Sequence, residues 1–153
     1  MIETAEDFRR AVDDAAADPA RLARTAAMSP CVWHEVLRRF PQLAVWVAAN
    51  RTLPDEIVAQ LALHESMQVR VAVASNPALQ EDAMLRLAHD KFDLVRMRIV
   101  CNASATREVL RALVSDSCVV VSLHAAARLQ HDINGVMLPA SYLDEVSVAD
   151  LLH

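Results

Sequence analysis

Three asparagines, Asn50, Asn76 and Asn102, lie 26 residues apart, and most apolar positions around them repeat at the same spacing. A fixed period of this length is typical of stacked-repeat proteins, in which each unit buries its apolar face against its neighbours. The period therefore predicts a stack of short repeats. The apolar columns include Leu53/Leu79/Ala105, Ile57/Ala83/Val109, Val58/Met84/Leu110, Leu61/Leu87/Leu113, Ala62/Ala88/Val114, Val69/Val95/Val121 and Val47/Val73/Ile99.

The composition predicts that these repeats are helical. The 153 residues include a single glycine, Gly135, and six prolines that fall at candidate element boundaries. Apolar residues make up 54% of the chain and aromatic residues only 4%. So few helix breakers, together with abundant alanine and leucine, favour helix nearly throughout. We therefore expect an all-α protein with an aliphatic core, in one domain that spans residues 1–153.

Each repeat has two parts. The first begins at Leu-Pro or Pro-x-Leu, has early acids such as Asp55, and carries the apolar stripe of a short amphipathic helix. It is expected to end near His64, Asp90 and Asp116. The second part, residues 69–77 in one repeat, alternates β-branched residues and could form a strand by period alone. Its recurring alanines and its stop at asparagine favour a short helix or a 3₁₀ turn instead.

The repeated asparagine closes the second part of each repeat. Asparagine tolerates the left-handed backbone that ends many helices, and its side chain can also bond neighbouring backbone in a turn. Stacked Asn50, Asn76 and Asn102 would then tie successive turns together. Arg128 occupies the same position one repeat further on. We expect a structural role for these asparagines rather than a ligand site.

The pattern extends towards both ends in a weaker form. Residues 1–20 predict an N-terminal capping helix, in which Thr4 and Asp7 approach a capping box. Residues 21–128 hold the repeats, and the register then slips by about seven residues. Residues 129–153 are therefore expected to form an insertion and a C-terminal cap. Atypical terminal units with polar outer faces allow a stack of repeats to end in water.

The motifs Val-Ala-x-Asn-Pro-x-Leu-x-x-x-x-Leu-x-x-Leu-Ala and Val-Arg-x-x-Val-Ala recur in one register over residues 43–128. In this respect the chain resembles the leucine-rich repeat variant family and, more distantly, HEAT-type helical repeats. The resemblance implies a right-handed α-solenoid of about five 24–26-residue repeats, each a short α-helix plus a shorter or 3₁₀ helix. Cysteine-rich modules that precede such repeats in the family are absent here, so no iron–sulfur cluster is expected.

Charge is uneven along the chain, whose net charge is −5. Residues 1–20 hold six acids and two bases, residues 133–153 three acids and no base, and residues 21–132 eleven acids and thirteen bases. Acidic ends around a nearly neutral middle do not supply the basic stripe of a nucleic-acid binder. Nucleic-acid binding is therefore an alternative rather than the first hypothesis, and the single lysine, Lys91, also counts against it.

Other features argue for a soluble cytoplasmic protein without metal or cofactor. No apolar run approaches the roughly 20 residues that cross a bilayer. The acidic start of the chain is unlike a secretory signal. The three cysteines, Cys31, Cys101 and Cys118, are odd in number and form no C-x-x-C pair, so neither a disulfide frame nor a zinc site is indicated.

No catalytic constellation emerges from the sequence. There is no glycine-rich phosphate loop, Gly-x-Ser-x-Gly elbow or His-Glu-x-x-His motif. Cys31 and His34 are three residues apart on an expected helix, but two ligands are too few for structural zinc. As a nucleophile–base pair they lack an orienting third group. An enzyme is therefore the third hypothesis, and no catalytic residue is assigned.

At two positions in the second part of the repeat the residue type differs from one repeat to the next, whereas the neighbouring positions keep similar residues. Stacking would align them as a ridge, and arginine and tryptophan are enriched at interface hot spots. Alternatively, Arg70 and Arg96 bridge to Asp90, Asp93 or Asp116, and Trp46 is simply core. The first hypothesis is a non-enzymatic protein–protein interaction module that binds a protein or peptide with an acidic segment. The ridge residues are Trp46, Arg70, Arg96, Arg98 and His124.

Overall fold

The computed structural model describes residues 2–14 and 28–134, and all regular structure within these ranges is helical. The all-α prediction is therefore confirmed for this part of the chain. The elements are α1 (Ala5–Asp14), α3 (Pro30–Arg39), the 3₁₀ turn η2 (Pro41–Leu43), α4 (Ala44–Ala48), α5 (Asp55–Ala62), α6 (Met67–Ala74), α7 (Glu81–Leu87), α8 (Asp93–Cys101), α9 (Arg107–Leu113) and α10 (Val119–Asn134).

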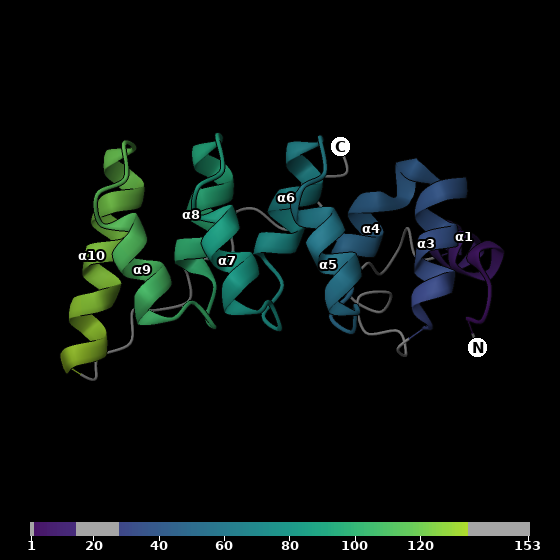
Figure 1. Cartoon of the computed structure of the whole chain (residues 1–153), viewed down its shortest axis with the longest axis horizontal. Helices are drawn as coiled ribbons and strands as arrows, with labels where there is room; N and C mark the ends of the chain where they lie inside the picture. The colour runs from purple at the N-terminus through teal and green to yellow at the C-terminus, as the bar shows by residue number, and fades with distance from the viewer. Residues whose placement is uncertain (1, 15–27, 135–153) are drawn as a thin grey trace.

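Helices two elements apart pack against each other, so the chain forms two layers. In one layer α3 packs on α5, α5 on α7 and α7 on α9, while in the other α4 packs on α6, α6 on α8 and α8 on α10. Contacts between α5 and α6, between α7 and α8, and between α9 and α10 join the layers. The described helices advance along the long axis of the molecule from α1 to α10 (Figure 1).

The first helix of each repeat begins and ends where the sequence predicts. α5 starts at Asp55 directly after Pro54, and α9 starts after Thr106, whose hydroxyl accepts a hydrogen bond from the Val109 amide at 3.3 Å. The capping box before α1 is also present. The Thr4 amide donates to an Asp7 carboxylate oxygen and the Asp7 amide donates to the Thr4 hydroxyl, each at 3.1 Å. Side-chain capping thus marks the starts of α1 and α9, whereas α5 begins after a proline without a side-chain cap.

The second helix differs from the prediction in the repeats after the first. In the first described repeat α4 has 5 residues, fewer than the 10 of α3, and follows the 3₁₀ turn η2, which fits the prediction. α6 and α8 are α-helices of 8 and 9 residues, so they are at least as long as α5 (8 residues) and α7 (7 residues) and are not 3₁₀ helices. The expectation of a shorter or 3₁₀ second helix was wrong for these repeats. Every residue from 69 to 74 is buried, because α4, α5 and α8 all pack on α6. A helix that is buried on most of its surface shows no single apolar stripe, so its length was underestimated from the pattern.

The core is aliphatic over most of its length and aromatic only near α1. Residues of the repeated apolar columns, such as Ile57, Leu61 and Leu87, are almost fully buried. At the N-terminal end Phe8 of α1 meets Trp33 of α3 edge-to-face, with ring centroids 5.2 Å apart. This pair closes one end of the described core.

At the other end α10 continues through residues 129–134, where an insertion was expected to begin. The remainder of that predicted insertion and cap, residues 135–153, lies outside the described residues. So do residues 15–20 of the predicted capping helix and residues 21–27 of the predicted repeat region. None of the described helices is long and apolar enough to cross a membrane.

Candidate functional site

Arg70, in the predicted ridge, is buried and faces the next repeat. Its Nε and Nη2 atoms donate to the two carboxylate oxygens of Asp90 at 2.5 and 3.1 Å. Its Nη1 atom donates to the carbonyl oxygens of His64 at 2.6 Å and Glu65 at 2.9 Å. Only 8% of the Arg70 side chain and 7% of the Asp90 side chain are exposed. Because its donors are already engaged, Arg70 does not offer a bidentate site to a partner's carboxylate.

Arg96 repeats this arrangement 26 residues later. Its Nε and Nη2 atoms donate to the Asp116 carboxylate at 2.7 and 2.8 Å, and its Nη1 atom donates to the Asp90 carbonyl at 2.7 Å. The alternative that both arginines bridge to aspartates of the stack is what the structure shows. We call Arg70, Asp90, Arg96 and Asp116 the Arg–Asp ladder.

The other three ridge residues lie apart from this ladder. Trp46 of α4 is half-buried and packs against the core. Arg98 of α8 and His124 of α10 are half-buried, and Nδ1 of His124 lies 2.8 Å from the Val120 carbonyl oxygen. Three of the five predicted partner-binding residues are thus partly accessible, whereas Arg70 and Arg96 are not.

The ladder shifts the ionisation of its acids. For Asp90, burial opposes ionisation, but the Arg70 guanidinium and the Phe92 amide outweigh it, and the pKa of Asp90 is lowered. For Asp116, the hydrogen bond from Arg96 is the main cause of a lowered pKa, and the Cys118 amide adds to it. Asp116 in turn raises the pKa of Arg96. Both carboxylates are therefore stabilised in their charged form.

Acid is expected to weaken the fold below about pH 4. The pKa of Asp90 and Asp116 is lowered from an ordinary value of 3.8, so the unfolded chain takes up protons first as the pH falls. Their contribution is complete above the unfolded pKa and is lost as the pH falls through the folded pKa. Urea unfolding at a series of pH values measures this loss. An Asp116→Asn variant should be less stable at neutral pH and lose less on acidification, and an equal loss in both proteins would contradict the assignment.

A second ladder is formed by the repeated asparagines. The Asn76 side-chain amide donates to the Asn50 carbonyl at 3.1 Å, and that of Asn102 donates to the Ala74 and Asn76 carbonyls at 2.8 Å each. Each Oδ1 atom accepts the backbone amide two residues on, from Ala78 to Asn76 and from Ser104 to Asn102, both at 2.9 Å. The prediction that these asparagines tie successive turns together is confirmed.

Arg128, at the asparagine position of the next repeat, donates to backbone carbonyls equivalent to those that Asn102 contacts. Its Nη1 atom donates to the Val100 carbonyl at 2.5 Å and to the Asn102 carbonyl at 2.7 Å. These carbonyls are one repeat on from the two that Asn102 contacts. A long side chain therefore continues the ladder from within α10, which does not end at this position.

Replacing Arg128 with methionine is expected to lower the free energy of unfolding by about 1–3 kcal/mol, because two carbonyl groups lose their donor. Methionine keeps much of the side-chain length and removes only the donors. Chemical denaturation of the purified variant measures the change. Arg107→Met, at an exposed position of α9, is the matched control and should change little. Equal effects of the two substitutions would contradict the role of Arg128.

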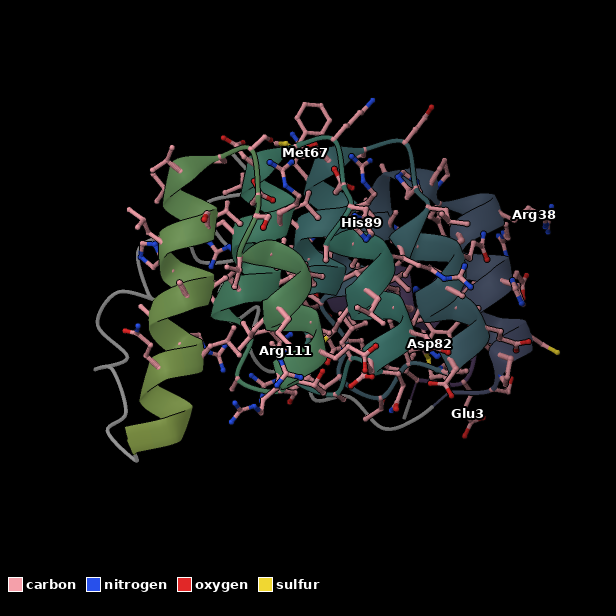
Figure 2. The ribbon with its side chains drawn as sticks, turned by 60° about the vertical axis from the view of Figure 1, so that its left-hand side comes forward. Glu3, Arg38, Met67, Asp82, His89 and Arg111 are labelled. Carbon is pink, nitrogen blue, oxygen red and sulfur yellow. The ribbon has the colours of Figure 1, made fainter. Side chains whose placement is uncertain are left out.

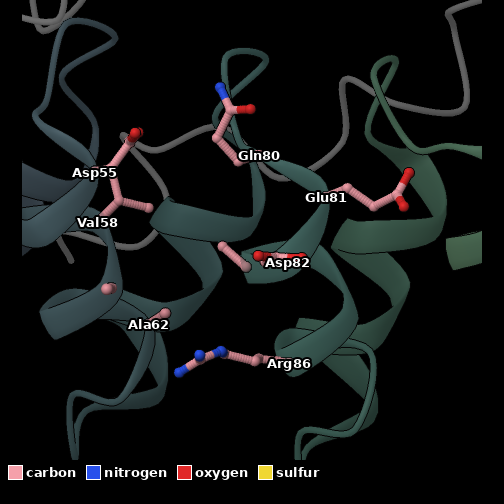
Figure 3. Close-up of a pocket in the computed structure, with 9 residues that line it drawn as sticks. Asp55, Val58, Ala62, Gln80, Glu81, Asp82 and Arg86 are labelled. Atoms are coloured by element: carbon pink, nitrogen blue, oxygen red, sulfur yellow. The ribbon is translucent and has the colours of Figure 1, made fainter.

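The sequence did not reveal a groove between α5 and α7. It has a volume of about 500 Å³ and opens on the outer side of these helices (Figure 3). Val58, Ala59, Ala62 and Ala83 supply its apolar surface. Longer polar side chains complete the lining, and these are Asp55, Gln80, Glu81, Asp82 and Arg86.

Small side chains account for this groove. The repeat column of Ala59 holds His34 in α3 and Leu85 in α7, and the column of Ala83 holds Ile57 and Val109. At these two positions the groove therefore has a methyl group where neighbouring repeats carry larger side chains. The sequence signal for the groove is a pair of alanines at repeat positions that hold larger side chains in other repeats. This signal can be interpreted only once α5 and α7 are known to be in contact.

The charges of the groove are separated along its length. Asp55 and Glu81 lie at the end where α5 and α7 begin, and Arg86 lies near the opposite end beside Ala62 (Figure 3). Asp82 projects from the exposed side of α7, and Arg111 does so from α9 (Figure 2). Among the described residues, none of the charged groups that line the groove takes part in an ion pair. They can therefore pair with a bound molecule.

Potential metal ligands do not cluster among the described residues. No group of three or more potential metal ligands occurs among them. Cys31 and His34 are both exposed on α3, and no hydrogen bond in the described part of the chain joins them. Burial raises the pKa of the Cys101 thiol, which disfavours the reactive thiolate.

Comparison of the chain with known protein families, with characterised proteins and with solved structures finds no match.

Proposed function

We propose that this chain is a right-handed α-solenoid of the leucine-rich repeat variant type, with about five repeats, that acts as a non-enzymatic protein–protein interaction module in the cytoplasm. Packing between helices two elements apart supports the repeat architecture. So do the two ladders, whose bonds recur at the repeat spacing. Three free cysteines fit a reducing compartment.

The groove between α5 and α7 carries the proposal for binding. Its volume of about 500 Å³ falls within the range of ligand pockets, roughly 300–1,000 Å³. Its apolar floor can bury side chains of a partner, while charges at both ends that form no ion pair within the described chain can orient it. Arg70 and Arg96 serve the stack. The remaining ridge residues, Trp46, Arg98 and His124, form a second candidate surface on the other layer.

Filling the groove tests the proposal. Ala59 is exposed in the groove, and leucine stands at the corresponding position 85 of α7, so Ala59→Leu should fold normally and obstruct the floor. We expect affinity capture from native lysate, followed by mass spectrometry, to recover at least one protein with the wild type and about ten-fold less of it with this variant. Circular dichroism would show that both proteins remain equally helical.

Ala112→Leu is the matched control, because Ala112 is also exposed on a helix of the same layer but does not line the groove. It should capture the same proteins as the wild type. If Ala59→Leu retains every captured protein, the groove is not the binding surface and the ridge residues Trp46, Arg98 and His124 become the next surface to test.

A further inference from the structure

The chemistry of the groove constrains what can occupy it. α5 and α7 both begin at the same end, so the carboxylates of Asp55, Glu81 and Asp82 belong to their first turns. Among the described residues of the lining, Arg86 in the last turn of α7 is the only base. The groove therefore has an acidic end and a basic end, with three acids to one base. An anionic occupant such as a nucleic-acid backbone would meet mainly repulsion there.

The floor of the groove is apolar. The side chains of Val58, Ala59, Ala62 and Ala83 carry no polar atoms, so a polar group placed over them would lose its hydrogen bonds to water without replacement. A volume of about 500 Å³ suits a short segment rather than a whole domain surface. The occupant should thus present small or medium apolar side chains between its charges.

We infer that the occupant of the groove is a short peptide segment of a partner protein, with a lysine or arginine at the Asp55–Asp82 end, apolar side chains over the alanines and an acidic group at Arg86. This inference rests on the proposed function and names the chemistry of its partner. Because the charged groups of the lining are largely exposed, they set orientation and specificity more than affinity, and salt weakens their contribution.

A peptide selection tests the inference before the partner protein is identified. Random 12-residue peptides displayed on phage would be selected on the full wild-type chain and counter-selected on Ala59→Leu. Peptides that survive would be synthesised and measured by fluorescence anisotropy. We expect them to share a basic residue, an apolar centre and an acidic residue, in one order.

Charge reversal then tests the contacts one by one. Asp82→Lys should weaken the selected peptides at least ten-fold, and changing their basic residue to glutamate should restore binding to that variant. Glu108→Lys is the matched control, because Glu108 holds the same repeat position as Asp82 on α9 and is exposed outside the groove. It should leave affinity within about two-fold of the wild type.

The possible failures are distinguishable. Peptides that require Ala59 but lack a basic residue, or bind Asp82→Lys as well as the wild type, would overturn the inferred chemistry and leave the groove as a binding site. If no selected peptide distinguishes the wild type from Ala59→Leu, the groove is not a peptide site. That result would overturn this inference together with the proposed use of the groove.

Discussion

Replacing Arg96 with alanine is expected to lower the free energy of unfolding by about 3–5 kcal/mol, the largest effect we expect from a single substitution in the Arg–Asp ladder. The substitution leaves the Asp116 carboxylate, 5% exposed, without its guanidinium. It also removes the donor to the Asp90 carbonyl. Breaking a buried ion pair from one side is costly because the remaining charge stays out of water without compensation.

Urea unfolding of purified Arg96→Ala measures this cost, with Arg111→Ala as the matched control. Arg111 lies exposed on α9 and forms no ion pair among the described residues, so its removal should change stability by less than about 0.5 kcal/mol. Replacing both partners, as Arg96→Met with Asp116→Leu, should recover much of the loss, because no buried charge is then left alone. If Arg96→Ala alone lowers the free energy of unfolding by less than about 1 kcal/mol, the Arg96–Asp116 pair is not buried in solution.

Replacing Asn102 with alanine is the second change with a large expected effect, a loss of about 2–5 kcal/mol in the free energy of unfolding. Asn102 is 5% exposed and makes three hydrogen bonds to backbone, two as a donor and one as an acceptor. Each buried polar group that loses its partner costs roughly 1–3 kcal/mol. The loss has a local and a long-range part, since one bond closes the Asn102 turn itself and two reach back to the preceding repeat.

An Asn102→Asp variant separates these two parts. Aspartate keeps the oxygen that accepts the Ser104 amide, but it presents a carboxylate where the amide donated to the Ala74 and Asn76 carbonyls. It should therefore be at least as unstable as the alanine variant at neutral pH, and recover partly in acid, when protonation supplies a donor. Gln60→Ala, on the exposed side of α5, is the control and should be nearly neutral. Equal stability of Asn102→Asp and wild type would disprove the inter-repeat bonds.

Together the two ladders hold α8 at both ends. Asp90 and Asp116 lie just before α8 and α10, where their carboxylates also accept the amides of Phe92 and Cys118 at 2.9 and 2.7 Å. Asn102 lies just after α8.

One earlier position carries only part of this pattern. His64 stands in the aspartate column, and its ring nitrogen accepts the Ser66 amide at 3.1 Å. The arginine column holds Ala44 one repeat before Arg70. His64 therefore keeps the local bond to the backbone amide two residues on. Ala44, the residue equivalent to Arg70 in the preceding repeat, cannot form an ion pair, and the position of the aspartate holds no acid.

The helix starts and the asparagine turns could be predicted because they depend on local chemistry. The breaks at Pro54 and Thr106, and the capping box of Thr4 and Asp7, follow from groups within a few residues of one another. The role of the asparagines was also predictable, since a turn-forming side chain at a fixed period must meet its counterpart in the next repeat. The backbone of Asn102, with φ −66° and ψ 125°, shows that its turn is extended rather than left-handed.

The sequence by itself determined the helical class, the repeat spacing and the asparagine turns, because helix propensity, apolar period and capping act over short distances along the chain. Only the tertiary structure decided that Arg70 and Arg96 point into the stack while Arg98 remains partly accessible. Arg96 and Arg98 lie on the same helix, and what distinguishes them is which residues of the next repeat pack against each side chain. It also decided the groove. Whether small side chains leave an opening depends on the helix packed beside them, and that contact joins two helices from successive repeats of the chain.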